Sequence, residues 1–180
     1  AVACRVTPCS MGIRDCERCF NGLVWMRPGG QLDIYDKRHL FRMAQEHTRY
    51  GDGKQRLIVE LNGWRICPMV CYDLRFPVWT RNRYDRAATR FDYDLLIFVA
   101  NWPAPRRYAW QTLLRARAIE NLSYCIGVIR AGIDGNGLSY AGDSAALYFL
   151  GQPRVGLGAH ERIVTITLDP AVPAAHRARF

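Results

Sequence analysis

A cysteine stands at the end of an apolar run in the stretch VCYDLRFP, residues 70–77. Cys71 is one of seven cysteines, and a free cysteine is usually an inert, buried hydrophobe. Here, however, the run before Cys71 predicts a buried strand, and the chain then turns toward a helix. A helix N-terminus lowers the pKa of a thiol and offers backbone N–H groups to an oxyanion. The stretch therefore makes Cys71 a candidate nucleophile.

A lysine in the segment YDKRHLFRMAQEH, residues 35–47, is the second candidate. Lys37 and Lys54 are the only lysines in a chain that otherwise uses arginine. Arginine does not give up its proton near neutral pH, whereas a buried lysine does, so Lys37 is a candidate for chemistry. An ordinary surface lysine is the alternative. Glu46 could hold Lys37 in place, although the spacing alone favours a solvated ion pair.

The remaining cysteines and the positive charge suggest two other kinds of site. Cys16 and Cys19 form a single CxxC, with Cys4 and Cys9 upstream, whereas a zinc site normally needs a second matched pair. The net charge of +9 could serve a nucleic acid, but the arginines are scattered and no binding motif accompanies them. We therefore expect no metal, no cofactor and no nucleic-acid partner. Unpaired cysteines without a visible secretory signal indicate the cytoplasm.

The elements that must position these residues are short apolar runs separated by turns. Strands are predicted at 21–26, 31–37, 56–61, 64–70, 94–102, 123–132, 142–150 and 162–169, and helices at 76–90 and 106–123. Pro-Gly-Gly and Asn-Gly turns predict hairpins between the first two pairs of strands. Helices between buried strands are typical of an α/β layered domain, which we expect to span residues 1–180. No apolar run is long enough for a membrane helix.

Four separate strings, YDKRHLF, VCYDLRFP, ANWPAPR and RARAIEN, together resemble the nitrilase (carbon–nitrogen hydrolase) superfamily. Within it they are most similar to bacterial omega-amidases, which act on amides of α-keto acids. The resemblance implies a layered α-β-β-α sandwich, incomplete at its N-terminus. It also implies a cofactor-free hydrolase that releases ammonia from a small α-keto-acid amide through a cysteine thioester. A homodimer is implied for the complete protein.

The resemblance also assigns roles in a Glu–Lys–Cys triad. Cys71 matches the nucleophile, and Lys37 matches the lysine that helps to stabilise the oxyanion. The backbone N–H of Tyr72 would be the second oxyanion donor. Glu46 resembles an additional glutamate that orients the site.

Further positions match the substrate pocket. Asn101 and Trp102 match a segment that lines the pocket beyond the nucleophile strand. Arg75 or Arg130 could receive a substrate carboxylate with two hydrogen bonds. This carry-over is weaker than that of the triad, because it depends on single residues.

The general-base glutamate of the family has no match in this chain. The family carries it in a string of the form PEMF before the lysine, whereas here only Glu17, in RDCERCFNG, precedes Lys37. We therefore expect that residues 1–180 lack the N-terminal part of the fold, fold poorly alone and have little amidase activity. The alternative is a catalytically impaired family fragment with a binding or structural role. The stretch 82–94 also looks longer than the usual family link, which suggests a short insertion.

Overall fold

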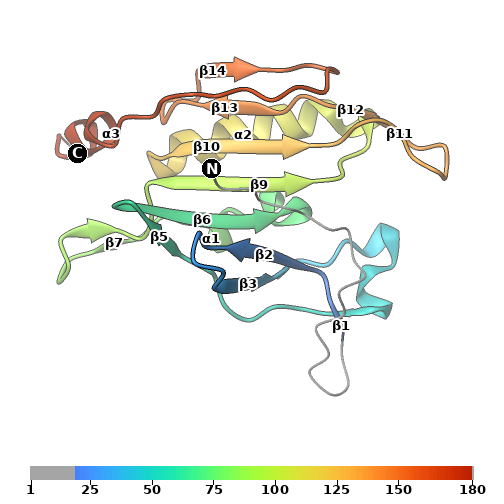
Figure 1. The fold of residues 1–180 in the computed structure, drawn as a ribbon, viewed down its shortest axis with the longest axis horizontal. Coiled ribbons are helices and arrows are strands. Elements are labelled where there is room, and N and C mark those ends of the chain that lie inside the picture. The colour runs from blue at the N-terminus through green and yellow to red at the C-terminus, as the bar shows by residue number, and fades with distance from the viewer. Residues whose placement is uncertain (1–18, 180) are drawn as a thin grey trace.

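A six-stranded mixed sheet forms the centre of the molecule (Figure 1). A computed structural model describes residues 19–179 of the chain. The strands lie in the order β14-β13-β10-β9-β6-β5. Their bounds are β5 Val59–Leu61, β6 Trp64–Val70, β9 Leu95–Ala100, β10 Tyr124–Ile129, β13 Ala145–Leu147 and β14 Pro153–Gly156. The neighbours β6, β9 and β10 run parallel, and the outer strands pair antiparallel.

The parallel strands are the apolar runs that the sequence predicts. In β9, Leu95 and Leu96 lie inside the molecule on opposite sides of the sheet, and so do Phe98 and Val99. A central strand of a parallel sheet is covered on both faces, which explains why its sequence is continuously apolar. Its position fixes those of β6 and β10 on either side.

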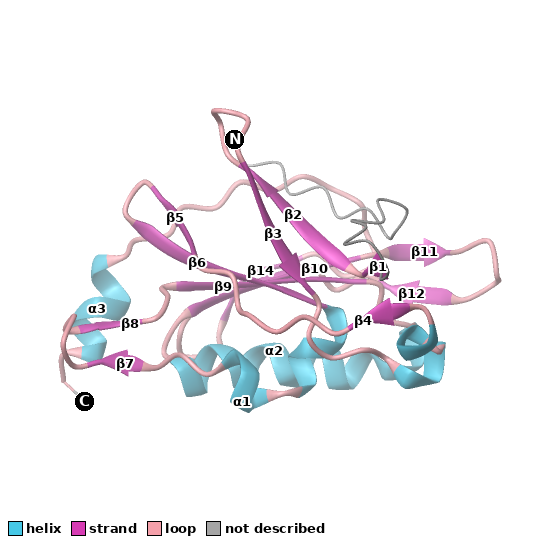
Figure 2. Cartoon of the chain, turned by 90° about the horizontal axis from the view of Figure 1, so that it is seen from below, coloured by secondary structure: helices cyan, strands magenta, loops and turns pink. Residues whose placement is uncertain are grey.

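Helices cover one face of this sheet, and a hairpin covers the other (Figure 2). The helices are α1 Pro77–Thr80 and α2 Arg107–Asn121, and the hairpin consists of β2 Gly22–Met26 and β3 Leu32–Asp36. A Cβ atom on Gly127 of β10 would lie 2.5 Å from Leu114 and 2.7 Å from Trp110 of α2. Glycine at this position therefore allows the close approach of helix and sheet. The layers confirm the predicted α/β class.

Both predicted hairpins are present, but the pattern of β3 does not reveal its inner face. Leu32 and Ile34 alternate with polar residues, yet they are 53% and 44% exposed. The inner face instead carries Tyr35 and, just after the strand, Lys37, both only 1% exposed. The second hairpin turns at Asn62 and Gly63, with φ angles of +48° and +79°, as a type I′ turn requires.

The predicted helix over 76–90 is wrong beyond Thr80. The chain forms a small hairpin instead, with strands β7 Tyr84–Asp85 and β8 Arg90–Phe91. The Asp85 carboxylate accepts hydrogen bonds from the N–H groups of residues 87 and 88, and such local bonds compete with a helix. The side-chain amide of Asn82 donates a hydrogen bond to the carbonyl oxygen of Tyr93 and accepts one from its N–H. These two bonds close the base of the hairpin.

The predicted strand over 162–169 is also wrong. A tight turn closed by Gly151 and Tyr148 returns the chain at once, so that β14 pairs with β13 at the sheet edge. The following run has no strand partner among the described residues, and Ile163 is fully exposed. Pro153 suits an edge strand, because it lacks the N–H donor of a central one.

The remaining elements are short. They are β1 Cys19–Phe20, β4 Tyr50–Gly51, β11 Ala131–Ile133, β12 Ser139–Ala141, α3 Ala171–Arg177 and the 3₁₀ helices Arg42–Ala44, Glu46–Thr48, Cys71–Arg75 and Ala104–Arg106. Within residues 19–179, none of the helices has the length and apolar character needed to cross a membrane.

Candidate active site

Three parallel strands end at the same edge of the sheet, and each is followed by a polar residue. Cys71 follows β6, Asn101 follows β9 and Arg130 follows β10. The ladder register aligns these ends, because it pairs residue 70 with 99 and residue 100 with 129. Ligands of α/β proteins bind at the carboxyl ends of parallel strands. The edge is therefore the expected place for a site.

A cavity of about 500 Å³ opens at this edge. It is lined by Asn21, Lys37, Glu46, Tyr50, Val70, Cys71, Val99, Ala100, Asn101, Val128, Ile129 and Arg130. Cys71, Lys37 and Glu46 therefore line the same cavity.

The backbone at Cys71 is strained. Its φ angle is +46°, in the left-handed region that non-glycine residues rarely adopt. Strain of this kind is often found at functional sites. The conformation ends β6 and starts a 3₁₀ helix, so the N–H of Tyr72 lies in the first helical turn and has no partner within the helix. The Cys71 Sγ lies 3.7 Å from the carbonyl oxygen of Asn101.

The Cys71 thiol is protonated at neutral pH, contrary to the lowering expected from the helix start. Burial raises its pKa to about 11, although the nearby Lys37 ammonium opposes this effect. The carboxylates of Glu46 and Asp73 contribute to the same rise in the pKa, with smaller effects than burial. The helix start therefore does not produce a resting thiolate. Attack by Cys71 requires a base that takes its proton.

The Lys37 ammonium is held by a carboxylate inside the molecule. Its Nζ lies 2.6 Å and 2.9 Å from the two carboxylate oxygens of Glu46. The same carboxylate accepts the N–H of Phe41 at 2.7 Å and the side-chain amide of Asn21 at 3.3 Å. The expectation of a solvated pair is wrong, because Lys37 is buried. Glu46 thus orients Lys37, and this part of the geometry fits the family role.

A second, smaller pocket of about 30 Å³ adjoins the cavity at Cys71 and Asn101. The predicted residues Tyr72, Arg75 and Trp102 line it. The guanidinium carbon of Arg75 lies 5.3 Å from the centre of the Trp102 ring, within cation–π range.

Sequence reasoning missed one functional candidate inside its own central motif. Asp73, in VCYDLRFP, is completely buried, and hydrogen bonds join it to the segment around Lys37. An acid within an apolar stretch was the available signal.

Glu17 and Cys16 lie outside the described residues. Within residues 19–179, no group of side chains could hold a metal ion.

Thiol labelling should separate Cys71 from the two buried cysteines of the sheet. Iodoacetamide should alkylate Cys71, which faces the cavity, well ahead of Cys67 and Cys125, which are fully enclosed. Because the thiolate reacts and the pKa is about 11, the rate should rise about tenfold per pH unit between pH 7 and 10. Peptide mapping by mass spectrometry measures each site separately, including the exposed Cys19. Equal alkylation rates at Cys71, Cys67 and Cys125 would contradict the assignment.

The chain is similar to known proteins over nearly all of its length. Residues 6–177 match the family model described as carbon-nitrogen hydrolase. Omega-amidase YafV of Escherichia coli strain K12 is 50% identical over 161 residues, which cover 89% of this chain and 60% of that protein. A 2-oxoglutaramate amidase of Bacillus subtilis strain 168 is 31% identical over 161 residues, with the same coverage of 89% and 60%.

The chain is also similar to solved structures. A CN-hydrolase superfamily protein from Xanthomonas campestris, with an arsenic adduct in its active site, is 57% identical. It superposes with a TM-score of 0.90, covering 94% of this chain and 64% of that chain. The present chain thus spans about 60% of the length of the curated relatives just described.

Proposed function

Because the chain belongs to the carbon–nitrogen hydrolase family, we propose that it carries the nucleophile and the lysine of an omega-amidase. The observation that carries this proposal is the meeting of Cys71, Lys37 and Glu46 in one cavity at the strand ends. The similarity to omega-amidase YafV supports the same reaction.

The proposed reaction proceeds in two steps. The Cys71 sulfur attacks the amide carbon, and the negative charge that develops on the amide oxygen is met by the Lys37 ammonium and the Tyr72 N–H. The carbon–nitrogen bond then breaks, the nitrogen takes up a proton, and ammonia leaves behind a thioester on Cys71. Water hydrolyses the thioester to the acid and restores the thiol.

The proton of the thiol needs an acceptor. Glu46 is the only carboxylate among the described residues that line the cavity, and its oxygens are already engaged by Lys37 and Phe41. Glu46 therefore serves to position the lysine in this proposal. The acceptor is a carboxylate outside the described residues, for which the resemblance implies a glutamate.

The substrate in this proposal is a small amide that also bears an α-keto acid. Arg130 lies on the same cavity wall as Cys71, with its guanidinium carbon 5.2 Å from the Tyr140 ring. No ion pair involves Arg130 or Arg75 in the part of the chain that the structure describes. Both guanidinium groups can therefore bind a carboxylate by donating hydrogen bonds to it. Arg130 is the better placed, because the pocket at Arg75 is too small for a substrate.

Replacing Arg130 by Met should raise KM for 2-oxoglutaramate about 10- to 100-fold and leave kcat roughly unchanged. The lost contact is a charge-assisted hydrogen bond of about 1.5–3 kcal/mol, which acts in the ground state and the transition state alike. A neutral amide of the same length should lose no affinity, because it has no carboxylate. Arg75→Met is the matched control, and a larger rise in KM for Arg75→Met than for Arg130→Met would assign the carboxylate to Arg75 instead.

Ammonia release from 2-oxoglutaramate by the full-length protein tests the proposed function. We expect turnover with this amide and little with amides that lack the keto acid. No turnover of any amide by the full-length protein would contradict the proposal. The alternative of a purely binding role gains no specific support from the cavity.

A further inference from the structure

The carboxylate of Asp73 lies where two loops meet. Its side chain is 0% exposed. The four groups that approach its oxygens are the N–H of Val70 at 3.2 Å, the hydroxyl of Tyr35 at 2.7 Å, and the N–H and ring Nδ1 of His39 at 3.0 Å and 2.8 Å. Each of the two carboxylate oxygens therefore has two of these contacts.

An ionised carboxylate only accepts hydrogen bonds, and its two oxygens have about four acceptor sites. At Asp73 all of them are used, with the Val70 and His39 N–H groups, the Tyr35 hydroxyl and the Nδ1–H of His39 as the donors. A buried charge is tolerated only when it is satisfied in this way. An amide in its place would turn one acceptor into a donor and lose two of the four bonds.

The contacts bind the two catalytic segments to each other. Asp73 follows Cys71 by two residues, and its bond to the N–H of Val70 closes the strained backbone around the nucleophile. His39 follows Lys37 by two residues, so its two bonds hold the segment that carries the lysine.

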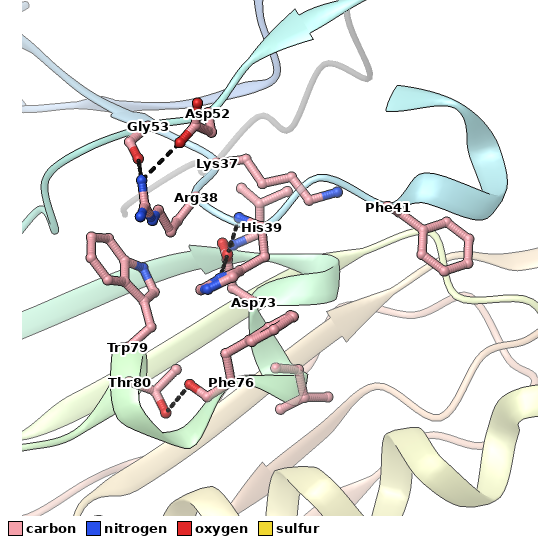
Figure 3. A network of polar contacts seen from close by, with 12 residues as sticks. Lys37, Arg38, His39, Phe41, Asp52, Gly53, Asp73, Phe76, Trp79 and Thr80 are labelled. Atoms are coloured by element: carbon pink, nitrogen blue, oxygen red, sulfur yellow. Dashed lines mark hydrogen bonds and ion pairs between the residues drawn. The ribbon is translucent and has the colours of Figure 1, made fainter. Parts of the chain in front are cut away.

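Aromatic side chains and hydrogen bonds surround Asp73 (Figure 3). The His39 ring stacks on Phe76 with ring centres 3.6 Å apart and an angle of 5° between the planes. The Tyr35 hydroxyl, which donates to Asp73, also accepts the indole N–H of Trp79 at 3.0 Å. In Figure 3, Arg38 extends away from Lys37 toward Asp52 and Gly53, which accept hydrogen bonds from its guanidinium at 2.8 Å and 3.0 Å.

We propose that Asp73 is a positioning residue that fixes the nucleophile backbone at Cys71 relative to the segment that carries Lys37. The proposal rests on the assignment of these two residues as the reacting pair. Asp73 does not line the cavity, so it acts through Cys71 and Lys37 and not on the substrate. Its loss should therefore weaken the influence of the lysine on the thiol.

A double-mutant cycle on the alkylation rate of Cys71 tests this role in the full-length protein at pH 8. Lys37→Met should slow alkylation about tenfold, because the ammonium lowers the thiol pKa and so favours the reactive thiolate. In the Asp73→Asn background, the same Lys37→Met change should slow alkylation less than about twofold. The direct effect of the lost Asp73 charge on the thiol occurs in both halves of the cycle and cancels.

Asp143→Asn is the matched control. Asp143 is also buried, at 7% exposed, and forms an ion pair with Arg107, but it does not line the cavity. In the Asp143→Asn background, Lys37→Met should still slow alkylation about tenfold. This is the result expected for a buried acid that has only a structural role. A full tenfold effect in the Asp73→Asn background would overturn the proposal.

Tyr35→Phe keeps the test decisive if Asp73→Asn does not fold. It removes one of the four donors and should give a coupling of the same sign but smaller size, whereas strict additivity would overturn the proposal. The readout is thiol chemistry with iodoacetamide and needs no amide turnover. A coupled cycle in a protein without amidase activity would therefore contradict the proposed function and leave the positioning role intact.

Discussion

Replacing Cys71 by Ala should lower kcat/KM for 2-oxoglutaramate by at least about 10⁴-fold, because removal of a nucleophile that forms a covalent intermediate has effects of this size or larger. The strained φ of +46° is already borne by a non-glycine residue, so alanine adds no new backbone conflict. The fold should therefore survive. Ammonia release and thermal unfolding, measured on the same preparation, separate loss of chemistry from loss of structure.

Cys125→Ala is the control for that experiment. Cys125 lies in β10 inside the sheet and does not line the cavity. Its loss removes a small buried side chain and should leave kcat within about twofold, with some loss of stability. Activity that survives in Cys71→Ala, or that disappears equally in Cys125→Ala, would contradict the role of Cys71.

Replacing Lys37 by Met should lower kcat about 10²–10³-fold, the usual cost of removing one oxyanion donor. It should also lower the free energy of unfolding by up to about 3 kcal/mol, since the Glu46 carboxylate loses its buried partner. Lys37→Arg should not restore activity, because Nζ lies at 2.6 Å from Glu46 and leaves no room for the broader guanidinium. Steady-state kinetics and thermal unfolding measure the two effects.

The chain provides a matched control in its only other lysine. The Lys54 side chain is 73% exposed and pairs at the surface with Asp52. Surface pairs of this kind contribute about 0–1 kcal/mol, so Lys54→Met should leave both activity and stability close to their original values. A loss of activity in Lys54→Met as large as that in Lys37→Met would indicate a general effect of charge.

Much of this arrangement could be predicted from local sequence. The apolar runs of β6, β9 and β10 are continuous because these strands are covered on both sides, and Asn62-Gly63 is specific for its turn. The four strings with a family resemblance identified the superfamily, which the family model and the related structure confirm together with the α/β sandwich. The position of Cys71 at a strand end followed from the same pattern.

Other features depend on tertiary contacts that no short stretch encodes. The alternation of β3 suggests that Leu32 and Ile34 form its inner face, but Tyr35 and Lys37 lie there instead. The Tyr35 hydroxyl donates a hydrogen bond to Asp73, and the Lys37 ammonium pairs with Glu46. Beyond Thr80, a hairpin replaces the predicted helix, and Asn82 at its base is held by hydrogen bonds to Tyr93 and to Asn121 at the end of α2. The raised pKa of the thiol follows from burial, which the position near a helix start does not reveal.

Several predictions come from the sequence alone. A homodimer, a cytoplasmic location and the absence of a nucleic-acid partner stay predictions of the sequence analysis, as does the single domain over 1–180. The glutamate that would take the thiol proton belongs with them. Because the resting thiol is protonated, attack by Cys71 depends on this base, whose loss should cost about 10²–10⁴-fold in rate.

Acid quenching during turnover tests the central claim most directly. The full-length protein is mixed with 2-oxoglutaramate, and the reaction is stopped with acid within the first turnovers. The protein is then digested, and the mass of the peptide that contains Cys71 is measured by mass spectrometry. The account predicts an acyl group on the Cys71 sulfur with the mass of the substrate less ammonia, and no such group on Cys67. The account would be contradicted if ammonia is released but no quench time shows an acyl group on Cys71.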